Sequence, residues 1–229
     1  MANANPLNNR FYPFTPYQRV MLLCTPLWNQ LAYNGARVIN KTFHHYRMAL
    51  PIDDLFPFLP WTIVIYFGCF LFWAVNYILA SMESREDSDR FFLADLLSKL
   101  VCLLVFVFFP ATMERPEVTG SDIFSQLVRI LYWLDPPTSL FPSIHCINSW
   151  LCWIVARRSR RIPRFYKWFS FLFAIAVCVS TLTVRQHVFV DTVSGVLLAE
   201  VCYCAAGSPI LLTLFRRGTD KILSLFQKK

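Results

Sequence analysis

The feature that most constrains this sequence is a series of apolar stretches that reach or approach the length of a membrane-spanning helix. A helix needs about 20 apolar residues to cross the hydrocarbon core of a bilayer. Four stretches have this character: Phe58–Leu79, Phe91–Pro110, Trp168–Val184 and Val188–Leu214. Only 16% of the residues are charged, whereas a soluble domain carries about a quarter. The sequence therefore predicts an integral membrane protein.

Two weaker stretches bring the expected number of spans to about six. Arg19–Arg37 is interrupted by Pro26, and Ser143–Ala156 is short. The N-terminal segment Met1–Thr15 is polar and lacks the apolar region of a cleaved signal peptide, so the first span is expected to direct its own insertion. We expect one all-α domain over residues 1–229, built as a bundle of about six transmembrane helices.

Basic residues are distributed unequally between the two ends of the predicted helices. With six spans, fifteen lysines and arginines fall on the side that holds both termini, and six fall on the opposite side. The positive-inside rule then predicts cytoplasmic termini in a multi-pass protein of the plasma membrane. The net charge of +8 and the basic run Arg157–Lys167 are explained by this topology and by anionic headgroups. We expect the bilayer as a partner and no nucleic acid, and the oligomeric state stays open.

One apolar segment is too short to span. Ile123–Leu134 has apolar residues at helical spacing. It is either an interfacial helix on the outer surface or a short re-entrant or packed helix.

The eight cysteines all lie within apolar segments and form no C-x-x-C pair. Free cysteine behaves as a small hydrophobic residue. We expect buried thiols, with neither a disulfide nor a metal site.

Three polar clusters interrupt the apolar background, and each falls in or beside a loop on the side with six basic residues. They are Arg115-Pro116, then Pro142–His145, then Arg185–His187 with Asp191 four residues after the histidine, all within residues 115–195. Because these loops share one face of the predicted bundle, we expect a single extracytoplasmic site there.

His187 and Asp191 stand at positions i and i+4, so on a helix they share a face. The carboxylate can accept a hydrogen bond from one imidazole nitrogen and leave the other as a nucleophile toward phosphorus. His145 is the complementary general acid, which protonates the departing alkoxide. Two histidines in opposite roles need no metal, and we expect no cofactor.

The surroundings of the two histidines suit a phosphate group. Ser143 begins a span whose N-terminus attracts an anion, and it adds a hydroxyl. Arg115 and Arg185 can supply paired donors to phosphate oxygens. Arg185 stands about 200° from His187 on a regular helix, so it serves only if the helix breaks there. Each residue alone also has a structural explanation, as a cap, a snorkelling arginine or a helix pair.

These residues resemble the motifs of the type 2 phosphatidic acid phosphatase superfamily of membrane lipid phosphatases, which read K-x6-R-P, P-S-G-H and S-R-x5-H-x3-D. The order of the motifs and the six-span layout both agree. The resemblance implies a nucleophile at His187 oriented by Asp191, and a general acid at His145. It also implies phosphate contacts from Arg115 and Ser143, and a phosphohistidine intermediate that water hydrolyses.

The sequence departs from the pattern of this family at three positions. Phe108 replaces the lysine of the first motif, and Ile144 replaces the glycine of the second. In the third motif Ser180 is present, but Thr181 replaces the arginine. Two cationic phosphate ligands are therefore missing from their motif positions, and Arg185 is the candidate to replace one of them.

These observations favour a phosphatase that acts on a lipid phosphomonoester or diphosphate, such as phosphatidic acid, phosphatidylglycerol phosphate or a polyprenyl diphosphate. The first alternative is a lipid phosphotransferase similar to the inositol phosphorylceramide synthases, which use the same His and His-Asp elements without the full third motif. Two further alternatives are an inactive relative of this family and a membrane transporter or scaffold with a vestigial site.

Charged residues inside the predicted spans are a separate feature. They are Asp95, Lys99 and Glu200, and such groups are usually paired or functional. We expect Lys99 to pair with Asp95 or with Glu200 as a structural clamp outside the active site.

Overall fold

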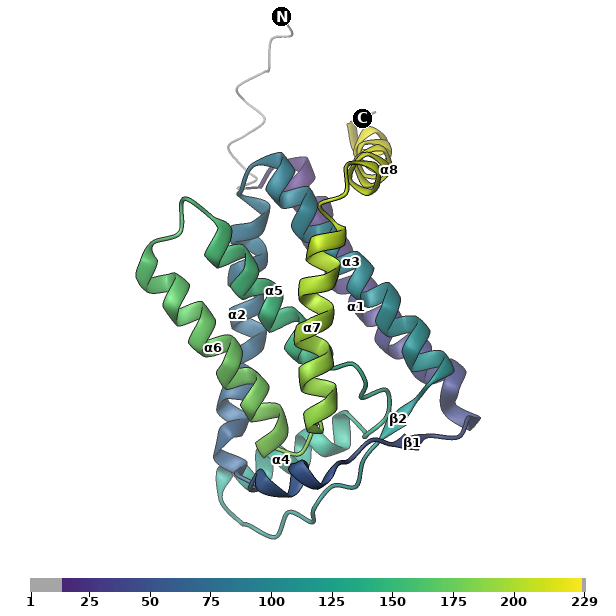
Figure 1. The fold of residues 1–229 in the computed structure, drawn as a ribbon, viewed down its shortest axis with the longest axis vertical. Coiled ribbons are helices and arrows are strands. Elements are labelled where there is room, and N and C mark those ends of the chain that lie inside the picture. The colour runs from purple at the N-terminus through teal and green to yellow at the C-terminus, as the bar shows by residue number, and fades with distance from the viewer. Residues whose placement is uncertain (1–13, 228–229) are drawn as a thin grey trace, which may run out of the picture.

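Six long helices form a bundle in the computed structural model, which describes residues 14–227 (Figure 1). They are α1 (Pro16–Ile39), α2 (Ile63–Ser81), α3 (Arg85–Phe108), α5 (Ile144–Arg158), α6 (Arg164–Thr183) and α7 (Phe189–Ala205). α4 (Ile123–Leu134) lies at one end of the bundle, and α8 (Pro209–Gln227) lies at the other end (Figure 1). Most of the N-terminal segment, Arg10 and the last two lysines lie outside the described residues.

Short elements close the end of the bundle that carries α4. The strands β1 (Tyr46–Arg47) and β2 (Ala111–Thr112) pair in parallel, with Tyr46 opposite Ala111. Three 3-10 turns complete the described elements: η2 (Asn40–Thr42), η3 (Pro51–Leu55) and η4 (Pro60–Thr62). Together with α4 they form a cap over the ends of the long helices (Figure 1).

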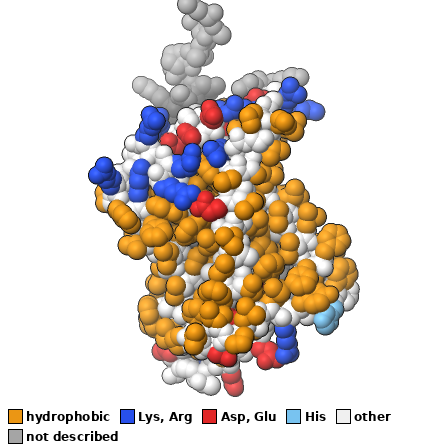
Figure 2. Space-filling model, in the orientation of Figure 1, with side chains coloured by type: hydrophobic (Ala, Val, Ile, Leu, Met, Phe, Trp, Pro, Cys, Tyr) orange, Lys and Arg blue, Asp and Glu red, His pale blue; other side chains and the backbone are white. Residues whose placement is uncertain are grey.

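Three described helical segments are long and apolar enough to cross a membrane: Pro60–Ser81, Arg85–Phe108 and Arg164–Thr183. α7 and α8 pass the same test only as a pair, which raises the number to four. Apolar side chains cover the middle of the molecule, and Lys and Arg gather at the end near α8 (Figure 2). These features indicate a membrane protein, whereas the six-span topology stays a prediction.

The last predicted span, Val188–Leu214, is wrong as a single helix. α7 ends at Ala205, and α8 begins at Pro209 at an angle of 86° to it. Pro209 has no amide hydrogen with which to continue the helical ladder. Arg90 packs closely against Gly207 at the bend. A Cβ at this position would stand only 2.8 Å from Nη2 of Arg90, so a larger residue would not fit without a shift. The chain therefore turns at the end of the bundle.

α4 has the bounds predicted for the short apolar segment. Asp122 caps its N-terminus by accepting hydrogen bonds from two backbone amides. Val128 and Leu131 are buried in a cluster with side chains of α2. Ile130 and Trp133 are exposed. α4 is thus a packed helix with a second apolar face that remains uncovered.

The predicted ion pair between Lys99 and Asp95 is confirmed. Nζ of Lys99 lies 2.7 Å from Oδ1 of Asp95, and both side chains are buried. Lys99 also donates to Oδ1 of Asn148 at 2.6 Å, and the hydroxyl of Tyr77 donates to Asp95 at 2.5 Å. Glu200 instead pairs with an arginine at the end of α5. The residues Tyr77, Asp95, Lys99 and Asn148, here called the Lys99 cluster, join α2, α3 and α5.

The cysteines follow the prediction in most cases. All eight thiols are free, and six of them are buried, whereas Cys24 and Cys204 are exposed. The buried six act as small apolar packing residues.

Candidate active site

The candidate site lies at the capped end of the bundle, where α5 and α7 both begin (Figure 1). Ser143 is the N-cap of α5, and its Oγ accepts a hydrogen bond from the amide of Cys146 at 3.4 Å. α7 begins at Phe189, immediately after the third polar cluster. The N-termini of two helices, whose dipoles favour an anion, therefore adjoin the same site.

Close packing between α5 and α7 brings the two histidine-bearing segments together. The amide of Ser143 donates to the carbonyl of Asp191 at 3.1 Å. Gly195 permits this approach, because a Cβ there would stand 2.7 Å from the Ser143 carbonyl oxygen. Ser143 is fully buried and its hydroxyl is used as the cap, so its side chain does not line the cavity of the site.

The chain breaks its helical path just before the second histidine. α6 ends at Thr183, and Arg185 adopts a positive φ of 54°. The amides of Gln186 and His187 both donate to the carbonyl of Thr181, at 2.9 and 3.1 Å. This turn, residues 184–187, ties the third cluster back onto the last turn of α6.

His187 and Asp191 are paired as predicted, but across the start of α7, because His187 precedes the helix and Asp191 lies in its first turn. Nδ1 of His187 lies 3.3 Å from Oδ2 of Asp191, which also accepts from the amide of Val188 at 3.1 Å. With the proton on Nδ1, the imidazole keeps a free lone pair on Nε2. Oδ1 of Asp191 is buried without a hydrogen-bond partner among the described residues.

His145 lies within a group of aromatic rings. The centroid of its ring is 4.6 Å from that of Tyr66 and 5.4 Å from that of Trp73. Tyr66, Phe70 and Trp73 follow one face of α2. The ring centroids of His145 and His187 are 5.8 Å apart. The structure therefore brings together the two histidines that the sequence placed on different segments.

A cavity of about 350 Å³ contains both histidines on its wall. The wall also includes Tyr33 of α1, Asp135 at the end of α4, and Gln186. Within residues 14–227, no three His, Cys, Asp or Glu side chains converge in the manner of metal ligands. Two imidazoles, the Gln186 amide and the Asp135 carboxylate converge. Asp135 is paired with Tyr33 and Arg37. The imidazoles and the amide suit nucleophilic attack and the binding of an anion.

Arg115 lies behind the wall of this cavity, in contact with Asp135 and Gln186, which line it. One terminal nitrogen donates to the carbonyl of Asp135 at 2.7 Å, and the other donates to Oε1 of Gln186. Its guanidinium carbon stands 4.5 Å from the centroid of the Tyr132 ring. Burial lowers the pKa of Arg115 and the nearby Asp135 opposes this shift, but a guanidinium stays charged at neutral pH. Nε of Arg115 is buried without a partner among the described residues.

Gln186 is a site residue that the sequence analysis did not identify. Its side chain is only 2% exposed, and its Nε2 is buried without a partner among the described residues. A buried donor with no acceptor is unfavourable by about 1–3 kcal/mol. The amide group would gain most from a ligand that brings an acceptor oxygen into the cavity. Its place in the polar cluster beside His187 was the available signal.

Tyr132 is a second residue that was missed. Its hydroxyl donates to the carbonyl of Val184 at 2.9 Å, while its ring lies under Arg115. Burial raises the pKa of Tyr132 to about 12, against the opposing charge of Arg115. The hydroxyl is therefore neutral and donates. Through Tyr132, α4 contacts both Arg115 of the first motif and the turn that carries His187.

The structure does not place Arg185 in the cavity. The helix breaks as the prediction required, but the guanidinium donates to the carbonyls of Asp53 and Phe56, at 3.1 and 2.8 Å. It therefore anchors the segment before α2 on the outer side of the turn.

Two of the substituted motif positions, Phe108 and Thr181, are not on the cavity wall, whereas Ile144, which replaces the glycine of the second motif, lines it. Phe108 is 77% exposed on α3. Thr181 is fully buried and donates to the carbonyl of Cys178 at 2.7 Å. Lys99 is held in the Lys99 cluster. Arg115 is thus the motif cation that remains beside the two histidines.

Comparison with known proteins gives one match. No curated protein and no solved structure matches the chain. The family described as the PAP2 superfamily matches residues 57–205, which is more than half of the chain and includes all three polar clusters. This match confirms the resemblance that the motifs indicated and supports a phosphatase-like activity. With both histidines, Asp191 and Arg115 inside the matched region, the chain belongs to the PAP2 superfamily.

Proposed function

We propose that the chain is a membrane phosphatase that hydrolyses a phosphomonoester or diphosphate of a lipid through a phosphohistidine at His187. The observation that carries this proposal is that His145 and His187 line one cavity with their ring centroids 5.8 Å apart. A phosphorus atom about 3–3.5 Å from a nitrogen of one ring can have its leaving oxygen within hydrogen-bond reach of the other ring when both rings line one cavity. One phosphoryl group can therefore contact both imidazoles.

The first step transfers the phosphoryl group to the protein. Nε2 of His187 forms a bond to phosphorus, and the bond between phosphorus and the lipid oxygen breaks with its electron pair on that oxygen. The protonated imidazole of His145 gives its proton to the departing oxygen. Asp191, which holds Nδ1 of His187, offsets the positive charge that the ring acquires.

The second step restores the protein. A water oxygen bonds to phosphorus as the bond to Nε2 breaks, and the electron pair returns to His187. His145 accepts the proton that the water loses, so both histidines regain their starting states. The products are inorganic phosphate and a lipid alcohol, or a lipid monophosphate where the substrate is a diphosphate.

The phosphate oxygens have donors available on the cavity wall, at Gln186, and directly behind it, at Arg115. Nε of Arg115 and Nε2 of Gln186 are buried and lack partners among the described residues. Arg115 also supplies the positive charge that offsets the charge of the transition state. In this proposal Gln186 takes a place in the phosphate site that the family pattern gives to a cation.

The lipid nature of the substrate and the orientation are also proposals. The histidines lie in a bundle whose middle is covered by apolar side chains (Figure 2), and an aromatic face of α2 adjoins His145. The site is at the end opposite α8 and the basic α5–α6 loop. With that basic end in the cytoplasm of a cell whose plasma membrane holds the protein, the site faces outward.

Phosphate release from purified protein in micelles tests the function. Phosphatidic acid, phosphatidylglycerol phosphate and a polyprenyl diphosphate are offered in turn, with and without a lipid alcohol as acceptor. We expect release from at least one of them, lost in His187→Ala and kept in His44→Ala, whose histidine is exposed elsewhere. Transfer to the alcohol that outruns hydrolysis would instead establish a phosphotransferase. Equal activity of His187→Ala and the unmodified protein would overturn the proposal.

A further inference from the structure

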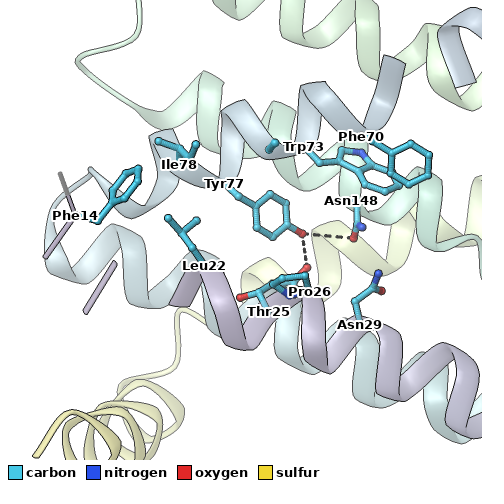
Figure 3. A pocket seen from close by; sticks show the side chains of 12 residues that line it. Phe14, Leu22, Thr25, Pro26, Asn29, Phe70, Trp73, Tyr77, Ile78 and Asn148 are labelled. Carbon is cyan, nitrogen blue, oxygen red and sulfur yellow. Dashed lines mark hydrogen bonds between the residues drawn. The ribbon is translucent and has the colours of Figure 1, made fainter. Parts of the chain in front are cut away.

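A second cavity of about 370 Å³ lies between α1 and α2 (Figure 3). It shares Asn29, Phe70 and Trp73 with the cavity of the candidate active site. The two spaces therefore adjoin on either side of these three side chains. The second cavity, here called the tail chamber, continues along the bundle toward Leu22 and Ile78 (Figure 3).

Small or interrupted positions create the space. Ala74 and Thr25 line the tail chamber from opposite helices. Pro26 lies inside α1 and cannot donate a backbone hydrogen bond there. Ala74 and Pro26 are also exposed, so the chamber is accessible from the apolar side of the bundle. Along α2, from Phe70 to Ile78, the chamber extends about 12 Å at the rise of a helix.

Polar groups on the chamber wall already have partners within the protein. Tyr77 donates to Asp95, and Asp95 and Asn148 both receive hydrogen bonds from Lys99. The wall therefore offers no uncompensated charge to a ligand, and most of its exposed surface is apolar. The exception is Oδ1 of Asn29, which is buried without a partner among the described residues. This atom lies where the two cavities meet.

We infer that the tail chamber binds the apolar chain of the lipid substrate while its phosphate group occupies the site at His145 and His187. This inference rests on the proposed function. An acyl or prenyl chain suits the apolar wall, because it passes from the apolar bilayer into the chamber without meeting an unpaired charge and gains van der Waals contacts there. The polar linkage between chain and phosphate then lies beside Asn29.

Filling the tail chamber tests this assignment. Ala74→Phe places a ring in the chamber, and Val75→Phe adds the same ring at an exposed position next to it. Each protein is assayed with dioleoyl phosphatidic acid and with its water-soluble dihexanoyl form. We expect Ala74→Phe to lower kcat/KM for the dioleoyl substrate at least tenfold and to change kcat/KM for the dihexanoyl substrate less than twofold. Val75→Phe should change neither value.

The other possible results show whether the chain-binding role of the tail chamber fails alone or together with the proposed phosphatase function. Equal losses on both substrates, or no loss on either, would overturn the tail chamber and leave the proposed function standing. An unmodified protein that hydrolyses neither substrate, nor the other lipid phosphates, would overturn the proposed function and the chamber with it. If Ala74→Phe does not fold, Leu22→Trp fills the chamber from the α1 wall and must give the same selective loss.

Discussion

The bundle contains two clusters of buried polar side chains, and they differ in how completely their hydrogen bonds are satisfied. In the Lys99 cluster the ammonium group is held by Asp95 and Asn148, and Asp95 also receives the hydroxyl of Tyr77. Every one of these contacts is internal. Such a cluster holds helices together and has little capacity left for a ligand.

The cluster at the two histidines is incomplete. Nε of Arg115, Nε2 of Gln186 and Oδ1 of Asp191 are all buried without partners among the described residues. Buried polar atoms are paired in most folded proteins, so unpaired ones call for an explanation. The comparison indicates that saturated polar groups stabilise the fold, whereas the unpaired donors of Arg115 and Gln186 are available to a substrate oxygen.

The largest effect is expected from Asp191→Asn. Asparagine keeps an acceptor for the amide of Val188 but cannot offset the charge on His187 or hold the same tautomer. We expect kcat to fall about 10³- to 10⁴-fold, with little change in the unfolding temperature. Phosphate release and thermal unfolding in micelles measure both. Asp54→Asn, at an exposed position, should change neither; a loss below tenfold in Asp191→Asn would remove the proposed role of the carboxylate.

Lys99→Met is expected to lower stability and to leave kcat nearly unchanged. Removing one member of a buried ion pair leaves Asp95 uncompensated, which lowers the free energy of unfolding by about 3–5 kcal/mol. The protein that remains folded should keep kcat for dihexanoyl phosphatidic acid within about threefold, because the cluster contributes no group to the reaction and the short chains do not need the tail chamber. Asp95→Asn in the same background should restore part of the stability. A variant with normal stability but no activity would break the comparison between the two clusters.

Gln186→Ala should produce an intermediate effect on activity. Losing one donor to a phosphate oxygen reduces kcat/KM by about 10- to 100-fold. Gln186→Glu should be worse, because its carboxylate would repel the phosphate and pair with Arg115. The matched control is Gln126→Ala on the exposed side of α4. Full activity in Gln186→Glu would show that this side chain does not contact the substrate.

The smallest effect is expected for Tyr132→Phe. The ring under Arg115 remains, and only the hydrogen bond to the carbonyl of Val184 is lost. We expect a loss of about 1 kcal/mol in stability and a several-fold decrease in kcat. Tyr46→Phe removes a hydroxyl from an exposed tyrosine and serves as the control. An unchanged kcat would mean that α4 does not position the turn at residues 184–187.

Local sequence patterns predicted those parts of the molecule that local physics determines. The apolar stretches located the long helices, because a helix that faces lipid must be apolar over most of its length. The pairs Lys99–Asp95 and His187–Asp191 were predicted because each joins residues four apart. The first lies on one face of α3, whereas the second forms across the start of α7. The bounds of α4 followed from its apolar period.

Features that depend on distant residues were not predictable in the same way. The 86° bend between α7 and α8 lies inside an apolar stretch that is continuous in sequence. Arg185 turns outward and Gln186 inward because of the positive φ at Arg185, which is unusual for a residue other than glycine. The carbonyl groups that hold Arg185 come from the segment before α2, so no local pattern around His187 reveals them.

Trapping the phosphorylated protein tests the central claim most directly. In His145→Ala, an aryl phosphate with a good leaving group needs no acid to phosphorylate His187, but hydrolysis of the phosphohistidine lacks its base. The phosphoryl group should therefore accumulate on His187, as peptide mass spectrometry under alkaline conditions can show. Phosphate release by the unmodified protein, with no phosphoryl group on His187 in this variant, would contradict the account.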